Sequence, residues 1–246
     1  MEKISTGSRD VDKWLGGYDC DTITTFYGPA GSGKTNFCVL AAASIARRKK
    51  VIFIDTEGGF SVERLRQITN SQQTENVFKN ILLLKPTNFY EQKLAFDRLL
   101  REIKNNKDIE LIVVDGMTML YRLESGQARS EKNNDKIRIL NRMLAKQLRI
   151  LAEIARKKYI PIIITNQIYH DFLSKEEIDA GVNKEDRIHM VGGDLLTYWS
   201  KCLIEIQNRD GKRRAILRKH RSLPEKEFPF VITNLGIEKA GFKIFS

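Results

Sequence analysis

Short runs of apolar residues alternate along the chain with stretches in which apolar residues recur every three or four positions. The runs are typical of strands buried on both faces of a sheet, and the periodic stretches are typical of amphipathic helices. Residues 51–54, 111–114 and 160–165 are such runs, residues 81–84 predict another strand, and residues 22–27 alternate β-branched with aromatic side chains. This order predicts an α/β fold around a mostly parallel central sheet flanked by helices.

Helices are expected between these strands. Ser8 is a suitable N-cap for a helix that the glycine pair at 16 and 17 ends. Apolar spacing predicts further helices within residues 37–45, 61–69, 96–106 and 137–155. Two polar stretches, 121–135 and 169–191, are predicted to be loops, and the length of the second indicates a function.

The last third of the chain has a different pattern. Residues 202–207 and 213–217 are strand-like and flank Arg209-Asp210-Gly211, a hairpin signal, and residues 228–233 predict one more strand. Antiparallel strands are therefore expected beside the parallel core, near the C-terminus. No repeat or linker divides residues 1–246, so a single domain is expected.

A phosphate-binding motif follows the predicted strand 22–27. Residues 28–35 are GPAGSGKT, a full match to the P-loop, in which glycines let backbone N–H groups surround phosphate oxygens. Lys34 would reach the β- and γ-phosphates of ATP, and Thr35 would ligate Mg²⁺. The alternative is a chance match, which the preceding strand and following helix disfavour. The predicted nucleotide contacts are Gly28, Pro29, Ala30, Gly31, Ser32, Gly33, Lys34, Thr35 and Asn36.

Polar side chains end three other predicted strands. Residues 55–57 (DTE) follow the strand 51–54, Asp115 ends the strand 111–114, and Asn166 and Gln167 follow the strand 160–165. Ligands of open α/β sheets bind at the carboxyl ends of strands, so these groups are expected near the P-loop. Asp115 fits a Walker B pattern and would hold Mg²⁺ with Thr35, although an aspartate can also end a strand by chance.

Composition narrows the class of protein. Lys and Arg number 42 against 31 Asp and Glu, and the net charge of +11 suits an anionic partner, although a generally basic proteome explains it equally well. The three cysteines are far apart and favour neither a disulfide framework nor a zinc site. Neither a signal peptide nor a membrane-length apolar run is present, so we expect a soluble, cytoplasmic protein.

Beyond the P-loop, several segments resemble the RecA/RadA recombinase superfamily, and most closely its archaeal RadB family, over nearly the whole chain. The shared segments are residues 4–8 (ISTGS), 15–17 (LGG), 54–58 (IDTEG), 63–65 (ERL), 164–167 (ITNQ), 191–193 (VGG), 218–221 (RKHR) and 223–225 (LPE). The resemblance implies a RecA-like P-loop NTPase core that uses ATP and Mg²⁺. It also implies a role in homologous recombination and DNA repair.

The resemblance assigns roles to individual residues. Glu57 would activate the attacking water, its alternative being an N-cap of the next helix, and Gln167 would sense the γ-phosphate. With Lys34 these residues form the implied catalytic set. Arg64 would stack on the adenine, unless it is simply solvated. Lys219 and Arg221 resemble cations that act on the nucleotide of a neighbouring subunit, which implies a homo-oligomer; the alternative is a basic surface strand.

The two polar loops would face DNA in such a protein. The first contains Arg122, Arg129 and Lys132, and the second contains Tyr169, His170, Lys175, Lys184 and Arg187. Cations there would neutralise phosphates, and the aromatic rings could stack on bases. The second loop also holds six carboxylates, which weakens the prediction of strand pairing. The three histidines share no metal-ligand spacing.

RadA-type recombinases carry an N-terminal DNA-binding domain and a polymerisation segment before the core, whereas this sequence begins at the core. We therefore expect an accessory protein with weak ATPase activity and no autonomous strand exchange. Its expected partners are single-stranded and branched DNA, with a RadA-type recombinase or a junction resolvase. Two alternatives stay open: an ATP-gated protein-interaction switch, and a KaiC-like or helicase-like ring ATPase.

Overall fold

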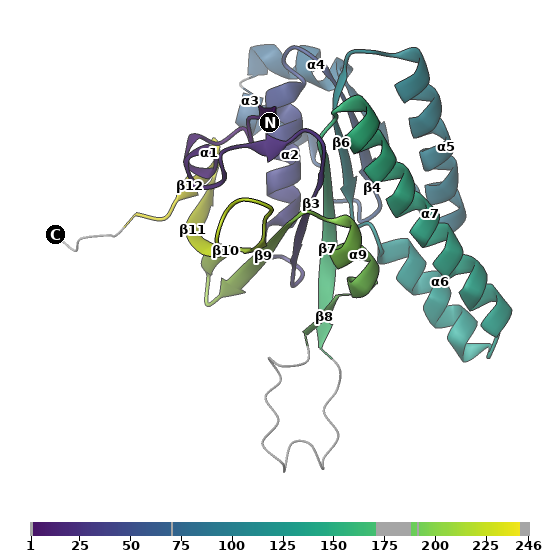
Figure 1. Ribbon diagram of the computed structural model, residues 1–246. Helices are drawn as coiled ribbons and strands as arrows, with labels where there is room; N and C mark the ends of the chain where they lie inside the picture. Colours follow the sequence, from purple (N-terminus) through teal and green to yellow (C-terminus); the bar gives the residue numbers. More distant parts are fainter. Residues whose placement is uncertain (1, 70, 171–187, 191, 242–246) are drawn as a thin grey trace, which may run out of the picture.

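A central sheet with helices on both faces forms the body of the protein (Figure 1). The computed structural model describes residues 2–69, 71–170, 188–190 and 192–241. Ten strands of the described residues join in this sheet, in the order β12-β11-β10-β9-β3-β7-β6-β4-β5, with β8 paired to β7. The strands are β3 (Ile23–Gly28), β4 (Lys50–Asp55), β5 (Ile81–Leu84), β6 (Ile109–Asp115), β7 (Ile162–His170), β8 (Ile188–Met190), β9 (Cys202–Arg209), β10 (Lys212–Lys219), β11 (Lys226–Thr233) and β12 (Gly236–Lys239).

The pairing divides the sheet into two parts. Strands β9, β3, β7, β6, β4 and β5 run parallel, whereas β10, β11 and β12 are added antiparallel through β9. The predicted α/β fold, with antiparallel strands near the C-terminus, is confirmed. A separate pair, β1 (Lys3–Ile4) with β2 (Tyr18–Asp19), lies at the N-terminus.

Each face of the sheet has its own apolar core. One core packs the sheet against α1 (Arg9–Leu15), α2 (Lys34–Ile45), α3 (Val62–Thr69) and α4 (Ser71–Lys79). The other packs it against α5 (Phe89–Asn105), α6 (Met119–Ser130), α7 (Asn134–Lys158) and α9 (Gly193–Trp199). None of the described helices is long and apolar enough to cross a membrane.

Local signals predicted the ends of α1 correctly. The side chain of Ser8 accepts a hydrogen bond from the Val11 N–H, and Gly16 ends the helix with a left-handed φ of 83°. A residue with a Cβ adopts that conformation at a cost, which is why glycine is common at this position.

The prediction of a loop over residues 121–135 is wrong. Most of it is α6, and only a short turn separates α6 from α7. Leu120, Tyr121, Ser125 and Ala128 are buried on α6, which packs against α7. Its apolar stripe is short and interrupted by Gly126, so tertiary packing rather than periodicity stabilises this helix. Residues 171–187 of the second predicted loop lie outside the described part of the chain.

Candidate nucleotide-binding site

The P-loop connects the end of β3 to the start of α2. A Cβ at Gly28 would lie 2.1 Å from the carbonyl oxygen of Ile206, so no other residue fits there. Gly31 and Gly33 have φ values of 70° and 110°, which other residues rarely adopt. No side chain of the described residues caps α2 and its first turn holds no acidic residue, so the N–H groups of Lys34 and Thr35 are available to an anion.

A hollow of about 260 Å³ opens over this loop. It is lined by Ala30, Gly31, Gly33, Lys34, Thr35, Asn36, Glu57, Gln167, Arg213 and Ile232. The predicted residues Lys34, Thr35, Glu57 and Gln167 therefore meet around one space, although β3, β4 and β7 deliver them from distant parts of the sequence. Arg213 is a lining residue that the sequence did not indicate.

Lys34 is buried at the floor of the hollow. Its Nζ donates to the carbonyl oxygens of Gly28 and Pro29, at 3.0 and 2.8 Å. Burial lowers the pKa of Lys34, while the carboxylates of Glu57 and Asp115 oppose the shift. An ammonium group has three protons to donate, so one remains for a phosphate oxygen after the two carbonyls are satisfied.

Thr35 and Asp115 meet below the hollow. The Thr35 hydroxyl donates to Oδ2 of Asp115 at 2.7 Å, and the Thr165 hydroxyl donates to Oδ1 at 2.6 Å. Burial raises the pKa of Asp115 to about 6, against the effect of these two hydrogen bonds. A divalent cation would favour the ionised carboxylate, so the pair fits the Mg²⁺ site that the sequence predicts.

The described residues contain no group of three His, Cys, Asp or Glu side chains arranged to hold a metal by themselves. Mg²⁺ usually binds one or two protein groups and takes its other ligands from phosphates and water. Thr35 and Asp115 therefore suit an ion that arrives with a nucleotide.

Gly116 allows the two carboxylate strands to approach each other. The Thr56 hydroxyl donates to the carbonyl oxygens of Asp115 and Gly116, at 3.0 and 2.7 Å. A Cβ at Gly116 would lie 2.4 Å from that hydroxyl and 2.6 Å from Cγ of Glu57. With its φ of 86°, position 116 requires glycine, and no sequence motif indicates this although the residue directly follows Asp115.

Glu57 and Gln167 are in contact across the hollow. Nε2 of Gln167 donates to Oε2 of Glu57 at 3.0 Å, and the other carboxylate oxygen, Oε1, is buried without a partner. A buried carboxylate oxygen without a hydrogen bond is costly, so this atom fits a site that a ligand or water completes. The alternative role of Glu57 as an N-cap does not hold, because Ser61 accepts from the first turn of α3. Asp55 instead accepts from the N–H groups of Gly59 and Phe60 and closes the turn that carries Glu57.

Arg64 lies beside the hollow on α3. Its Nε donates to Oδ1 of Asn36 at 2.9 Å, and a terminal nitrogen donates to Gln67. The guanidinium is thus held against the first turn of α2 rather than freely solvated. Its predicted contact with adenine stays a prediction.

Comparison with known proteins identifies the family of this chain. The Rad51 family profile matches residues 1–240. The chain belongs to the Rad51 family. It is 39% identical to the DNA repair and recombination protein RadB of Methanocaldococcus jannaschii, over 91% of this chain and 96% of that protein. The protein of the same name from Methanothermobacter thermautotrophicus is 40% identical, over 89% of this chain and 88% of its own.

A crystal structure of a RadB recombinase has the same fold, with a TM-score of 0.73, 31% identity and coverage of 96% of this chain and 99% of that one. The resemblance found in the sequence is therefore confirmed, and the RecA-like core follows from it.

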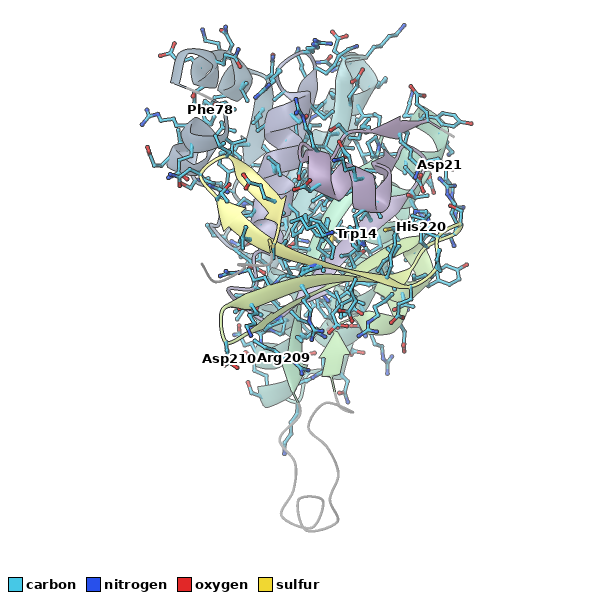
Figure 2. The ribbon with its side chains drawn as sticks, turned by 90° about the vertical axis from the view of Figure 1, so that its left-hand side faces the viewer. Trp14, Asp21, Phe78, Arg209, Asp210 and His220 are labelled. Atoms are coloured by element: carbon cyan, nitrogen blue, oxygen red, sulfur yellow. The ribbon has the colours of Figure 1, made fainter. Side chains whose placement is uncertain are left out.

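Lys219 and Arg221 lie far from the P-loop of their own chain. Strand β10 runs from the hairpin at Arg209 and Asp210 toward the other end of the strands, where His220 and Asp21 are found (Figure 2). Lys219 donates to the carbonyl oxygen of Thr197 at 2.7 Å, and Arg221 donates to Asp19 and Asp21. Lys219 and Arg221 of this Rad51-family chain therefore do not line the hollow of their own subunit.

The predicted DNA contacts are placed only in part. Arg122 and Arg129 lie on α6 rather than on a loop, and Arg129 and Lys132 are exposed near the turn into α7. Tyr169 and His170 are the last two residues of β7. Lys175, Lys184 and Arg187 lie outside the described residues. Their predicted roles stay predictions for this Rad51-family chain.

Proposed function

We propose that the chain binds ATP with Mg²⁺ in this hollow, hydrolyses it slowly, and binds DNA as an accessory protein of recombination and repair. The observation that carries the proposal is the meeting of Lys34, Thr35, Glu57 and Gln167 around one hollow, with Asp115 bonded to Thr35 below it. These groups supply a cation, a metal pair, a carboxylate and an amide. That combination serves phosphoryl transfer, in which positioning and electrostatics do most of the work.

Each residue has a distinct task in this proposal. Lys34 binds oxygens of the phosphate chain, and Thr35 and Asp115 hold Mg²⁺, which neutralises charge developing on the transferred phosphoryl group. Glu57 orients the attacking water and takes its proton through the oxygen that has no partner. Gln167 holds Glu57 until the γ-phosphate offers the amide a second acceptor.

Lys34→Ala tests nucleotide binding directly. The variant is expected to keep its fold and to lose ATP binding, measured by titration calorimetry with Mg²⁺ present. Lys146→Ala is the matched control, because Lys146 is exposed on α7, on the opposite face of the sheet from α2, and does not line the hollow. ATP binding by a folded Lys34→Ala protein at wild-type affinity would contradict the proposal.

Assembly would complete the site if Lys219 and Arg221 act on a neighbouring subunit. Lys219 and Arg221 lie at the end of the strands away from the P-loop, so they cannot contact the nucleotide of their own chain, and this supports the trans arrangement. Mixing a Glu57→Gln protein with a Lys219→Ala/Arg221→Ala protein tests it. Some mixed interfaces then combine an intact Glu57 with intact cations, so ATPase activity returns only on mixing. No recovery in the mixture would reject the trans arrangement.

DNA binding is supported by the net charge of +11 and by the exposed Arg129 and Lys132 on one side of the fold. The names of the RadB relatives, which refer to DNA repair and recombination, support the same role. Affinity for single-stranded DNA should fall steeply with salt, because phosphate contacts release counterions. We extend the proposal to a RadA-type recombinase or a junction resolvase as the protein partner.

A pair of double variants tests which cations contact DNA. Arg129→Gln/Lys132→Gln should reduce the salt dependence by about one ion per lost phosphate contact. Arg47→Gln/Arg48→Gln removes the same charge from the exposed turn that follows α2, at the end of this helix away from the P-loop, and should leave the salt dependence unchanged. Equal effects of the two double variants would mean that net charge alone attracts DNA.

A second candidate function is an ATP-gated switch for a protein partner, in which turnover is incidental. The hydrogen bond between Gln167 and Glu57 favours it, because the amide can change partners when a γ-phosphate is present. Glu57→Gln separates the two functions. If partner loading and repair survive this change but fail in Lys34→Ala, the switch is the function; if both changes abolish them, turnover is required.

A further inference from the structure

Arg213 is a second cation at the nucleotide hollow, and its place follows from the register of β10. Arg213 pairs with Asn208 of β9 and with Phe230 of β11. Side chains alternate along a strand, so Arg213 shares a face with Ala215 and Leu217, which belong to the core around α2. This row of side chains continues past the core to the edge of the sheet that carries the P-loop.

Strand β11 brings this row against the P-loop. A Cβ at Gly33 would lie 2.9 Å from Cδ1 of Ile232 and 3.9 Å from the ring of Phe230. Phe230 is the residue opposite Arg213, and both Ile232 and Arg213 line the hollow. The cation is therefore positioned beside the start of α2, where the phosphate chain would lie.

Arg213 differs from its neighbours in having no acceptor among the described residues. Its Nε is buried without a hydrogen-bond partner, and no residue in the described part of the chain forms an ion pair with it. Arg214 instead pairs with Glu227 and Gln207, and Arg218 pairs with Glu205 and Glu225. A buried guanidinium nitrogen without an acceptor is costly, so a ligand oxygen would stabilise it.

We propose that Arg213 binds an anionic oxygen of the phosphate chain of the nucleotide held in the same subunit. This inference rests on the proposed function, because it names one more contact in the same hollow. Lys34 and Arg213 would then grip the phosphates from two sides, one from the P-loop and one from the antiparallel strands. Arg213 is a binding residue that acts within one chain, unlike the cations at the far end of β10.

Arg213→Gln tests the contact, with Arg214→Gln as the matched control on the next residue and the other face of the strand. Affinity for Mg²⁺-ATP should fall about 10- to 100-fold in Arg213→Gln, the usual effect of losing a charged hydrogen bond. It should change less than about threefold in Arg214→Gln. Arg213→Lys keeps the charge and should recover part of the loss.

Competition by inorganic tripolyphosphate identifies the group that Arg213 contacts. If the contact is to phosphate, tripolyphosphate loses affinity by about the same factor as ATP; an unchanged value would assign Arg213 to the base or sugar and overturn the proposal. Thermal unfolding without ligand tests for a structural role. Because the buried Nε of Arg213 makes no hydrogen bond within the described residues, Arg213→Gln should leave the free protein equally or more stable, and a large loss of stability would assign Arg213 a structural role instead. A wild-type protein that binds no ATP would reject the proposed function itself, whereas normal ATP affinity in Arg213→Gln rejects only this inference.

Discussion

Gln167 donates from Nε2 to Oε2 of Glu57 across 3.0 Å, and this bond joins groups delivered by β7 and β4, on either side of β6. It holds the carboxylate in one orientation over the P-loop. Gln167→Ala should therefore lower the ATPase kcat by about 10- to 100-fold while the Kd for ATP changes little, since the loss affects the reacting geometry more than binding. Gln207→Ala, which removes an amide bonded to Glu205 outside the hollow, is the control. An unaltered kcat in Gln167→Ala would show that this hydrogen bond does not contribute to turnover.

Thr165→Val should destabilise the protein. The hydroxyl of Thr165 is fully buried, donates to Asp115 and accepts from the N–H of Gly116 at 2.7 Å. Valine keeps the shape but leaves both groups unsatisfied, so the free energy of unfolding should fall by about 1–3 kcal/mol in urea titrations. The same change at Thr233, whose hydroxyl is exposed, should cost less than about 0.5 kcal/mol. Equal losses at the two positions would argue against the buried bonds as the cause.

Gly116→Ala should destabilise the protein although it adds only one methyl group. Its Cβ would overlap Thr56 and Glu57, and the φ of 86° is unfavourable for alanine. We expect a loss of about 1–3 kcal/mol in the free energy of unfolding, with a lower ATPase rate because Glu57 is displaced. Gly126→Ala is the opposite case: this glycine is inside α6 with open space around it, and alanine should add about 0.5–1 kcal/mol. Chemical denaturation should show a lower free energy of unfolding for Gly116→Ala and a higher one for Gly126→Ala than for the wild-type protein.

The three cysteines should react slowly with thiol reagents in the folded protein. Cys20, Cys38 and Cys202 are free and buried. Burial raises the pKa of Cys20 to about 11 and that of Cys202 to about 12, and raises that of Cys38 well above its usual value. Only the thiolate is a strong nucleophile, so at mildly alkaline pH little of any thiol is reactive. A colour assay with an aromatic disulfide should detect all three only in concentrated denaturant; rapid reaction of any one in native buffer would contradict its burial.

The elements predicted correctly are those with strong local signals. The buried runs of β4 and β6 need both faces covered, and the Ser8 cap of α1 accepts from Val11, only three residues away. Helix α6 was missed because its stability comes from packing against α7 rather than from its own periodicity. Helices α4 and α9 were not anticipated either, and both are short.

The candidate site divides in the same way. Lys34, Thr35, Asp115, Glu57 and Gln167 could be named from motifs because each ends or follows a parallel strand, and such ends meet at one edge. Their roles stay predictions, but Lys34, Thr35, Glu57 and Gln167 line one hollow and Asp115 lies directly below it, which agrees with that expectation. Thr165 had a weak signal, since it precedes Asn166 at a strand end. Arg213 had none, because it is one of several cations on a hairpin.

The sequence by itself determined the parallel strands, the P-loop and the groups at the strand ends, because periodicity and glycine spacing act over a few residues. Only the tertiary structure decided which cation meets the P-loop. The register of β10 against β11 turns Arg213 toward the hollow and Arg214 away from it. A shift of one residue would exchange them, and register depends on pairing between strands rather than on either strand alone.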